Sequence, residues 1–195
     1  MWKRNINLIG NKTINMNIMK FIHIIKQIFK SIHSVFLIRG RNIKISKEAH
    51  LFKHVKIKVI NGGKCEFGKC ILNDNTFICS DGGLVKIDNG VSINRNSILV
   101  SRELIHIGEG SSIGPNVCIY DHDHKFDING FRKDEFKVGR IEIGRNVWIA
   151  ANCCIFRNTA IGDNCIIGAG VVVSGRIPSN TILRNNKDYR LEDLR

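Results

Sequence analysis

The sequence predicts an all-β fold, a left-handed parallel β-helix with an N-terminal amphipathic helix and one protruding loop at about residues 121–140. Three observations carry this prediction. Aliphatic residues recur every six positions, a glycine or asparagine stands three positions after seven of the nine, and a small residue stands one position further on in those seven. Ordinary strand alternation has a period of two and places no turn residue inside a six-residue unit. The pattern therefore indicates short strands separated by regular corners.

The six-residue pattern keeps its register on both sides of the interruption at 121–140. Glycine and asparagine tolerate the left-handed backbone conformation, so their position predicts a repeated corner. Three units would close one triangular coil, with the aliphatic side chains stacked along its axis and the small ones in its narrow interior. The aliphatic positions are Ile107, Ile113, Ile119, Ile143, Ile149, Ile155, Ile161, Ile167 and Val173. The corner positions are Gly110, Asn116, Asn146, Asn152, Asn158, Asn164 and Gly170. Two cysteines, Cys153 and Cys165, fall on the small interior position, so a structural role is expected for them.

Upstream of residue 107 the pattern continues with a local irregularity. Ile87, Ile93 and Leu99 keep the six-residue spacing, and two extra residues then precede Ile107. Residues 43–86 are more degenerate, so we expect further coils there without an assigned register. The signals in that region are Ile45, Leu51 and Ile57, which stay in phase, and the candidate turns Gly62-Gly63 and Gly82-Gly83.

The N-terminal part carries nearly all of the net charge of +13. Residues 1–60 hold 13 Lys and Arg against Glu48 alone, which is +12, and the remaining residues hold 17 against 16, which is +1. Residues 16–38 place apolar side chains at helical spacing opposite a basic polar face, which predicts an amphipathic helix. Such a helix would cap the open end of the β-helix or lie on an anionic membrane surface. The chain is therefore divided into a basic segment at 1–42, a β-helix at 43–178 and a tail at 179–195.

The cysteines and the hydropathy pattern favour a reducing compartment. The seven cysteines are an odd number, they form no Cys-x-x-Cys pair, and no cleavable signal peptide is expected. Charged residues interrupt the candidate apolar stretch, so no membrane span is expected. The sequence predicts a cytoplasmic protein in which residues 16–38 would contact the inner face of the membrane.

The segment at 143–178 resembles the hexapeptide-repeat acyltransferases, and it reads IGRNVWIAANCCIFRNTAIGDNCIIGAGVVVSGRIP. It is most similar to the galactoside, maltose and nodulation-sugar O-acetyltransferases and to capsule or lipopolysaccharide O-acetyltransferases. The resemblance covers roughly residues 85–180. It implies a homotrimer of left-handed β-helices that binds acetyl-CoA between neighbouring subunits, moves the acetyl group to a hydroxyl, and uses one histidine as general base.

The same resemblance puts the general base in the loop that leaves the coil, which begins IYDHDHKFD at 119–127. His124 matches the catalytic position of the family, and His122, two residues earlier, is the alternative. A free imidazole titrates near neutral pH, so it can take a proton from an alcohol there. Asp121 or Asp123 would orient the imidazole or remain a solvated loop residue.

The acceptor is expected to lie beside this loop. Asn94 matches the acceptor-contacting asparagine of the family, and Trp148 matches a tryptophan beside the acceptor and the pantetheine channel. For Trp148 the alternative is a structural aromatic at a coil corner. The other residues expected to line the acceptor site are His122, Asp121 and Asp123.

The resemblance also assigns the coenzyme A contacts. Ala151 and Ala169 match positions whose backbone contacts the CoA arm, and Ser174-Gly175 replaces a Thr-Lys pair, so that lysine is absent. After the last coil the sequence Arg184-Asn185-Asn186-Lys187-Asp188 departs from the family. Other cations would therefore bind the nucleotide phosphates, and the candidates are Arg176, Arg184, Lys187 and Arg190.

Three other interpretations stay open. His106, His122 and His124 invite comparison with the zinc-binding histidines of γ-type carbonic anhydrases, but those ligands do not sit in a DHDH turn before a long loop, so no metal is expected. A β-helix can also be a non-catalytic adaptor, which the presence of His124 disfavours. The expected acceptor is a surface-glycan sugar, since a basic N-terminus suits an acidic or membrane-linked partner. The alternative acceptor is a free sugar or an antibiotic. No aromatic and basic platform accompanies the charge, so nucleic acid is not expected as a partner.

Overall fold

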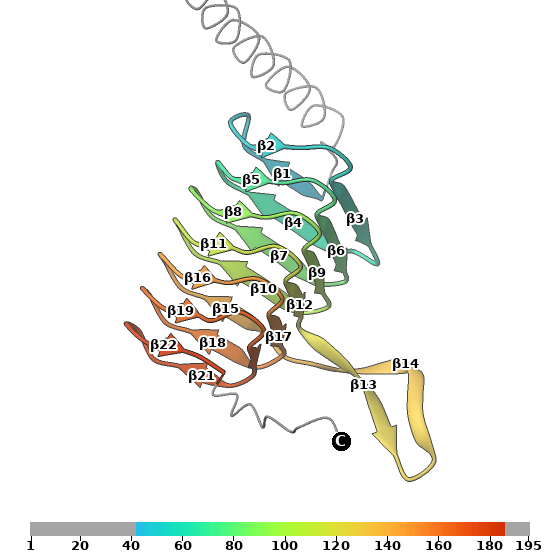
Figure 1. Cartoon of the computed structure of the whole chain (residues 1–195). Helices are drawn as coiled ribbons and strands as arrows, with labels where there is room; N and C mark the ends of the chain where they lie inside the picture. The colour runs from blue at the N-terminus through green and yellow to red at the C-terminus, as the bar shows by residue number, and fades with distance from the viewer. Residues whose placement is uncertain (1–41, 186–195) are drawn as a thin grey trace, which may run out of the picture.

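The computed structural model describes residues 42–185, which form a parallel β-helix with a projecting arm (Figure 1). Three sheets run along the body. Sheet A holds β1 (Ile43–Ile45), β4 (Lys64–Phe67), β7 (Leu84–Ile87), β10 (Leu104–Ile107), β15 (Ile141–Ile143), β18 (Thr159–Ile161) and β21 (Arg176–Ile177). Sheet B holds β2 (His50–Leu51), β5 (Ile71–Leu72), β8 (Ser92–Ile93), β11 (Ser112–Ile113), β16 (Trp148–Ile149), β19 (Ile166–Ile167) and β22 (Ile182–Leu183). Sheet C holds β3 (Lys56–Ile60), β6 (Phe77–Asp81), β9 (Ile98–Ser101), β12 (Cys118–Tyr120), β17 (Cys154–Phe156) and β20 (Val172–Val173).

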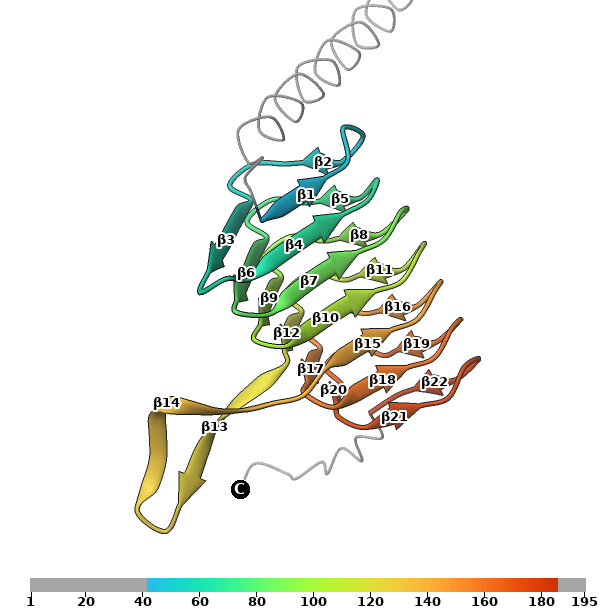
Figure 2. The ribbon, with the colours of Figure 1, turned by 180° about the vertical axis from the view of Figure 1, so that it is seen from behind.

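The chain passes through sheets A, B and C in turn, so that each circuit makes one coil. Strands of neighbouring coils pair in parallel; β12, for example, lies between β9 and β17. The described residues make six complete coils and the first two strands of a seventh. Figures 1 and 2 show this stack from opposite sides. The parallel β-helix predicted from the repeats is confirmed.

The repeated positions of the sequence have the burial that the pattern predicts. The nine aliphatic positions from Ile107 to Val173 are each at most 3% exposed. Burial of one such side chain contributes about 1.5–3 kcal/mol, so the stacked column is the main source of stability. The small positions also point inward, and Cys153 and Cys165 are fully buried among them. The structural interpretation of these two thiols agrees with that position.

Asparagine at the corners does more than tolerate a left-handed backbone. Asn116 and Asn152 have φ of 57° and 60°. The amide of Asn96 donates to the Asn116 side chain at 3.2 Å, and that of Asn116 donates to Asn152 at 3.1 Å. These residues lie where sheet B meets sheet C, which we call the B/C corner. The side-chain ladder links successive coils there, which glycine could not do.

The degenerate region at 43–86 also forms coils. In sheet A, Cys65 pairs with Val85 and Phe67 pairs with Ile87. Cys65 and Phe67 are buried where later coils have aliphatic residues, and this replacement hides the repeat in the sequence. The expected turns are present, since Gly62 and Gly82 both have φ of 79°.

The interruption at 121–140 forms an antiparallel arm of β13 (His122–Asp127) and β14 (Gly130–Val138). The arm extends from the body in both views (Figures 1 and 2). Its root is closed by a backbone hydrogen bond from Gly139 N to Asp121 O at 2.9 Å. Because the chain leaves and returns at one point, β15 still pairs directly with β10, and the stack of coils continues.

Some expectations concern residues outside 42–185. The amphipathic helix at 16–38 lies outside the described residues, and so does most of the tail after residue 185. The β-helix continues past the expected boundary at 178, because β22 pairs with β19 and Leu183 packs against the core. The spacing shortens from six to four between Val173 and Ile177, which hides this strand in the sequence. No helix in the described part of the chain is long and apolar enough to span a membrane.

Candidate active site

The arm begins at Asp121, where sheet C meets sheet A, which we call the C/A corner. The side chain of Asp121 is fully buried. Its carboxylate accepts hydrogen bonds from the Ser101 hydroxyl at 2.7 Å and from the backbone N–H groups of Arg102 and Glu103 at 2.7 and 2.8 Å. The start of the arm is therefore fixed to the preceding coil by a charged carboxylate that accepts several hydrogen bonds.

His122 completes this arrangement. Its Nδ1 lies 3.1 Å from the Asp121 carboxylate, and its side chain is 14% exposed. Burial alone would raise the pKa of Asp121, but the hydrogen bonds from His122, from the two backbone N–H groups and from Ser101 outweigh it and lower the pKa. A carboxylate that stays ionised holds Nδ1 as the protonated nitrogen, which leaves Nε2 of His122 as a base.

His124 is oriented in a different way. Its Nδ1 lies 3.2 Å from the backbone carbonyl oxygen of Arg132, on the other strand of the arm. A carbonyl can only accept, so Nδ1 carries the proton and Nε2 is the basic nitrogen. The ring also lies against Phe136, at 4.6 Å between ring centroids. His124 is exposed, so it can meet a substrate from outside the coil.

The structure separates the roles proposed for the two aspartates. Asp123 accepts a hydrogen bond from Arg157 Nε at 2.5 Å. Arg157 follows β17 in the next coil, so this ion pair attaches the arm to the body from the other side. Asp121 orients an imidazole, that of His122, and Asp123 instead anchors the arm.

The remaining candidate residues fall at two corners of the coil. Ser174 and Gly175 follow β20 at the C/A corner, like the arm, and Arg176 begins β21. Asn94 follows β8 at the B/C corner, where its side chain accepts from Arg95 N at 2.8 Å. The others on that side are Ala151, Ala169 and Arg184 at the B/C corner and Trp148 on β16, 53% exposed. Lys187 lies outside the described residues.

Sheet C separates these two groups within one chain. Strand β9 has four residues and by itself spans about 13 Å between the B/C corner, where Asn94 lies, and the C/A corner. One chain therefore does not bring Asn94 and Trp148 to His124. Sequence reasoning did not single out Phe136, which lies on the arm, or Arg102 and Arg157, which contact the arm from the body.

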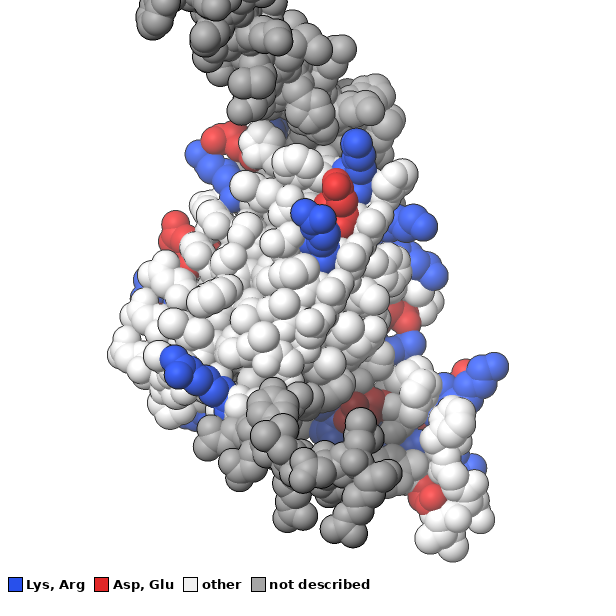
Figure 3. Space-filling view, viewed as in Figure 1, with Lys and Arg blue, Asp and Glu red and all other residues white. Residues whose placement is uncertain are grey.

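The outward face of sheet C is apolar from β6 onward, whereas β3 places Lys56 and Lys58 at the start of the same rows. In register across the strands lie Phe77, Ile98, Cys118, Cys154 and Val172, followed by Cys79, Val100, Tyr120 and Phe156. The outward row of sheet A carries instead Lys44, Glu66, Lys86, His106, Glu142 and Arg176. Figure 3 views the body from the side opposite to sheet A, and few charged side chains appear on it.

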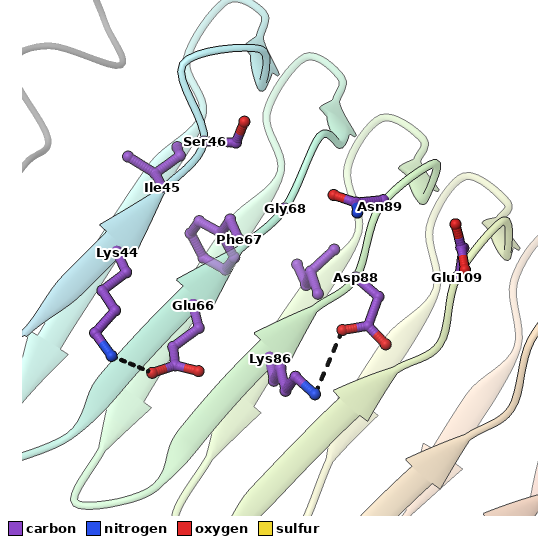
Figure 4. A pocket seen from close by; sticks show the side chains of 11 residues that line it. Lys44, Ile45, Ser46, Glu66, Phe67, Gly68, Lys86, Asp88, Asn89 and Glu109 are labelled. Carbon is purple, nitrogen blue, oxygen red and sulfur yellow. Dashed lines mark hydrogen bonds and ion pairs between the residues drawn. The ribbon is translucent and has the colours of Figure 1, made fainter.

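A groove of about 410 Å³ lies on sheet A in the first coils (Figure 4). Ion pairs cross it between Lys44 and Glu66 at 3.0 Å and between Lys86 and Asp88 at 3.5 Å. Its lining includes none of the candidate active-site residues. His106 pairs with Asp88 on this face at 2.8 Å, and residues 42–185 contain no cluster of three His, Cys, Asp or Glu arranged for a metal.

The described residues form a parallel β-helix of six-residue repeats with a histidine-bearing arm, and known proteins share this repeat and this fold. Residues 140–175 match the bacterial transferase hexapeptide family, with six repeats. The galactoside O-acetyltransferase of Escherichia coli is 33% identical over 103 residues, which cover 53% of this chain and 51% of that protein. The galactoside O-acetyltransferase of Lactococcus lactis is 30% identical over 118 residues, which cover 60% and 57%. The resemblance inferred from the repeats is confirmed.

A solved structure with the same fold is an N-acyltransferase from Bacillus cereus, in complex with coenzyme A and dTDP-4-amino-4,6-dideoxyglucose. It has a TM-score of 0.61 at 20% identity, and the match covers 72% of this chain and 77% of that one. The chain spans little more than half the length of the two galactoside O-acetyltransferases. Residues 140–175 are therefore similar to the bacterial transferase hexapeptide repeats, and the described residues share their fold with this N-acyltransferase.

Proposed function

We propose that this protein is an acetyl-CoA-dependent O-acetyltransferase that modifies a hydroxyl of a sugar, in capsule, lipopolysaccharide or another surface glycan. The observation that carries the proposal is the orientation of His124. It lies outside the repeat pattern, on an arm fixed to the coil, with Nδ1 bound to a backbone carbonyl and Nε2 as the base. The O-acetyltransferase names of relatives that match the repeat region support the reaction class.

The chemistry follows from this geometry. Nε2 of His124 takes the proton of the acceptor hydroxyl as its oxygen attacks the thioester carbonyl. The C–S bond then breaks, and the imidazolium returns the proton to the departing coenzyme A sulfur. General base catalysis of this kind contributes roughly 10²–10⁴-fold, and holding both substrates in one cleft supplies much of the remainder.

The active unit in this proposal is a homotrimer with its sites between subunits. Two observations support it: the candidate residues lie at two corners on either side of sheet C, and the face between them is apolar. A second copy packed on that face would bring the B/C corner of one subunit, with Asn94, Ala151 and Ala169, to the arm of another. The small side chains of Ala151 and Ala169 leave room for the CoA arm beside their backbone. Arg176, Arg184 and Lys187 are the candidates for its phosphates.

The acceptor and the location belong to the same proposal. The +12 of residues 1–60 suits an anionic glycan or an anionic membrane that carries lipid-linked precursors. The protein is proposed to act in the cytoplasm, with residues 16–38 at the inner face of the membrane. The left-handed sense of the coil remains a prediction.

The test is a screen of the full chain with acetyl-CoA and a panel of neutral sugars, sialic acids, oligosaccharides and hydroxyl-bearing antibiotics. Thiol release reports turnover, and mass spectrometry identifies the acetylated product. Transfer to a glycan supports the proposal, and transfer to an antibiotic alone moves the acceptor to that class. If calorimetry detects no binding of coenzyme A, the enzyme assignment is wrong, and the non-catalytic adaptor becomes the better explanation.

A further inference from the structure

We propose that Arg102 is a positioning residue for the candidate base, and that it acts through Phe136, whose ring it holds against His124. The inference rests on the proposed function, because it concerns the imidazole that accepts the proton.

The arm by itself does not determine where His124 points. Its two strands pair with each other and with no other described strand, and an isolated two-stranded hairpin is marginally stable. The strand register also shifts between His124 and Lys125. The ring of His124 contacts Phe131 on the outer part of the arm, at 5.6 Å between centroids, but Phe131 is itself 68% exposed. A link from the exposed ring to the body must therefore come from contacts near the root of the arm.

Arg102 lies where the repeat has its two extra residues, between Leu99 and Ile107. The insertion forms the C/A corner of the coil that precedes the arm. Its backbone N–H groups bind Asp121, as described above, and the Arg102 side chain continues to β14. The Arg102 guanidinium carbon lies 3.5 Å from the centroid of the Phe136 ring. The irregularity in the repeat thus supports the arm through both main chain and side chain.

The body fixes the position of Arg102 in turn. Its Nη2 lies 2.5 Å from the carboxylate of Asp81, one coil earlier, and that carboxylate also accepts from Asn61 Nδ2 at 2.5 Å. Arg102 Nε is the one buried side-chain polar atom of residues 42–185 without a hydrogen-bond partner. A buried guanidinium normally pairs all of its donors, so the unpaired Nε is unusual. The contacts that hold the Arg102 side chain are therefore the ion pair with Asp81 and the stacking on Phe136.

Phe136, held by Arg102, contacts the rings of both histidines. Its ring lies 4.6 Å from that of His124 at an interplanar angle of 40°, and 5.5 Å from that of His122 at 78°. His124 is thus held at Nδ1 by the Arg132 carbonyl and along its ring by Phe136. Together with the Phe131 ring, these contacts set the direction of Nε2, and among them only Phe136 is held by a side chain of the body. Because Phe136 touches both rings, the inference holds for either histidine as the base.

The test replaces the planar side chains of Arg102 and Phe136 in the full-length protein with side chains that cannot stack. Arg102→Lys keeps the charge beside Asp81 but loses the flat stacking surface. We expect its kcat to fall about tenfold, with the KM for acetyl-CoA unchanged, because the base is misdirected and the donor site is intact. Phe136→Leu should fall by a similar factor, and Phe136→Tyr should keep the rate. The double variant should be no slower than Phe136→Leu, since both changes act through one contact.

Phe126→Leu is the matched control. Phe126 lies on the same arm, is 70% exposed, and has Lys137 Nζ 4.9 Å from its ring centroid. Its loss removes an equivalent cation–aromatic contact whose ring is not in contact with either histidine, so kcat should not change. Thermal melts and sedimentation identify any variant that has lost its fold or assembly.

Nuclear magnetic resonance provides a readout that does not depend on turnover. The wild type should show nuclear Overhauser effects between the Phe136 and His124 rings, and Arg102→Lys should weaken them and move the His124 ring signals. Unchanged signals together with unchanged kcat would overturn the inference. An inactive wild type would refute the proposed function, and the ring signals would still decide the role of Arg102.

Discussion

The imidazole of His122 donates through Nδ1 to the carboxylate of Asp121 at 3.1 Å, although Asp121 is fully buried and the arm that follows it is exposed. This pair joins a buried corner of the coil to the exposed arm. Asp121 belongs to the coil through Ser101, Arg102 and Glu103, and His122 is the first residue of the arm. The position of the candidate base is thus coupled to the packing of the C/A corner in the preceding coil.

The two histidines should differ in their effect on catalysis. His124→Ala is expected to lower kcat by about 10²–10⁴-fold, because the general base is lost, while the KM for acetyl-CoA stays close to that of the wild type. His122→Ala should cost about tenfold or less, through loosening of the arm. Steady-state thiol release with the best acceptor measures both. A reversed order would assign the base to His122 and its Asp121 partner.

Replacing Asp121 should weaken the arm and the fold together. Asp121→Asn has only one side-chain oxygen, so it cannot accept every hydrogen bond that the carboxylate accepts. Its NH₂ group would also face the hydrogen-bond donors that surround the carboxylate. We expect a loss of about 1–3 kcal/mol in the free energy of unfolding, measured by denaturant titration. Asp123→Asn is the control, because its Arg157 partner is partly exposed and the variant should lose less than about 1 kcal/mol. Equal losses would contradict this account of the root.

The same carboxylate should contribute to acid sensitivity. The fold lowers the pKa of Asp121 below the ordinary value of 3.8, so folding favours its ionised form. The stability from this group is present above the unfolded pKa and is lost as the pH falls through the folded value. The difference in unfolding free energy between wild type and Asp121→Asn should therefore shrink as the pH falls below about 4. A difference that stays constant down to pH 2 would exclude this group as the cause.

Substitutions of Asn116 can separate the stability that comes from the side-chain hydrogen bonds of the ladder from the stability that comes from tolerating a positive φ. Asn116→Gly keeps access to φ of 57° but removes both amide hydrogen bonds to the neighbouring coils. Asn116→Ala removes them and also strains the backbone, at about 1–2 kcal/mol. Thermal melts should rank the wild type above the glycine variant and the glycine variant above alanine. Glycine as stable as asparagine would show that the ladder contributes nothing.

A charge on sheet C should disrupt the proposed trimer. Val172 lies on the outward face of that sheet and is 63% exposed in the single chain. Val172→Asp would bury a carboxylate in the interface, so sedimentation should detect monomers. Ala160→Asp, at an exposed outward position of sheet A, is the matched control and should leave the assembly intact. Intact trimers in both variants would place the interface elsewhere.

Much of the body follows from local sequence. Seven units between Ile107 and Val171 have the same order of aliphatic, corner and small residues, and each class has one energetically suitable place in a coil. The degenerate first coils were harder to predict, because Cys65 and Phe67 occupy positions that aliphatic residues fill later. The candidate site was predictable as far as the residues that resemble the family, above all His124. Arg102 and Arg157 gave no such signal, since their partners lie 34 positions away in the sequence, at Phe136 and Asp123.

The sequence by itself determined the repeating coil, the place of its interruption and the histidines within it. It could do so because each six-residue unit specifies a strand, a corner and the buried core positions together. The tertiary structure alone decided that the interruption is a two-stranded arm, that Asp121 rather than Asp123 orients an imidazole, and that Asn94 and His124 lie at different corners of one chain. These relationships depend on which coils stack beside one another, and stacking brings together residues that no local spacing connects.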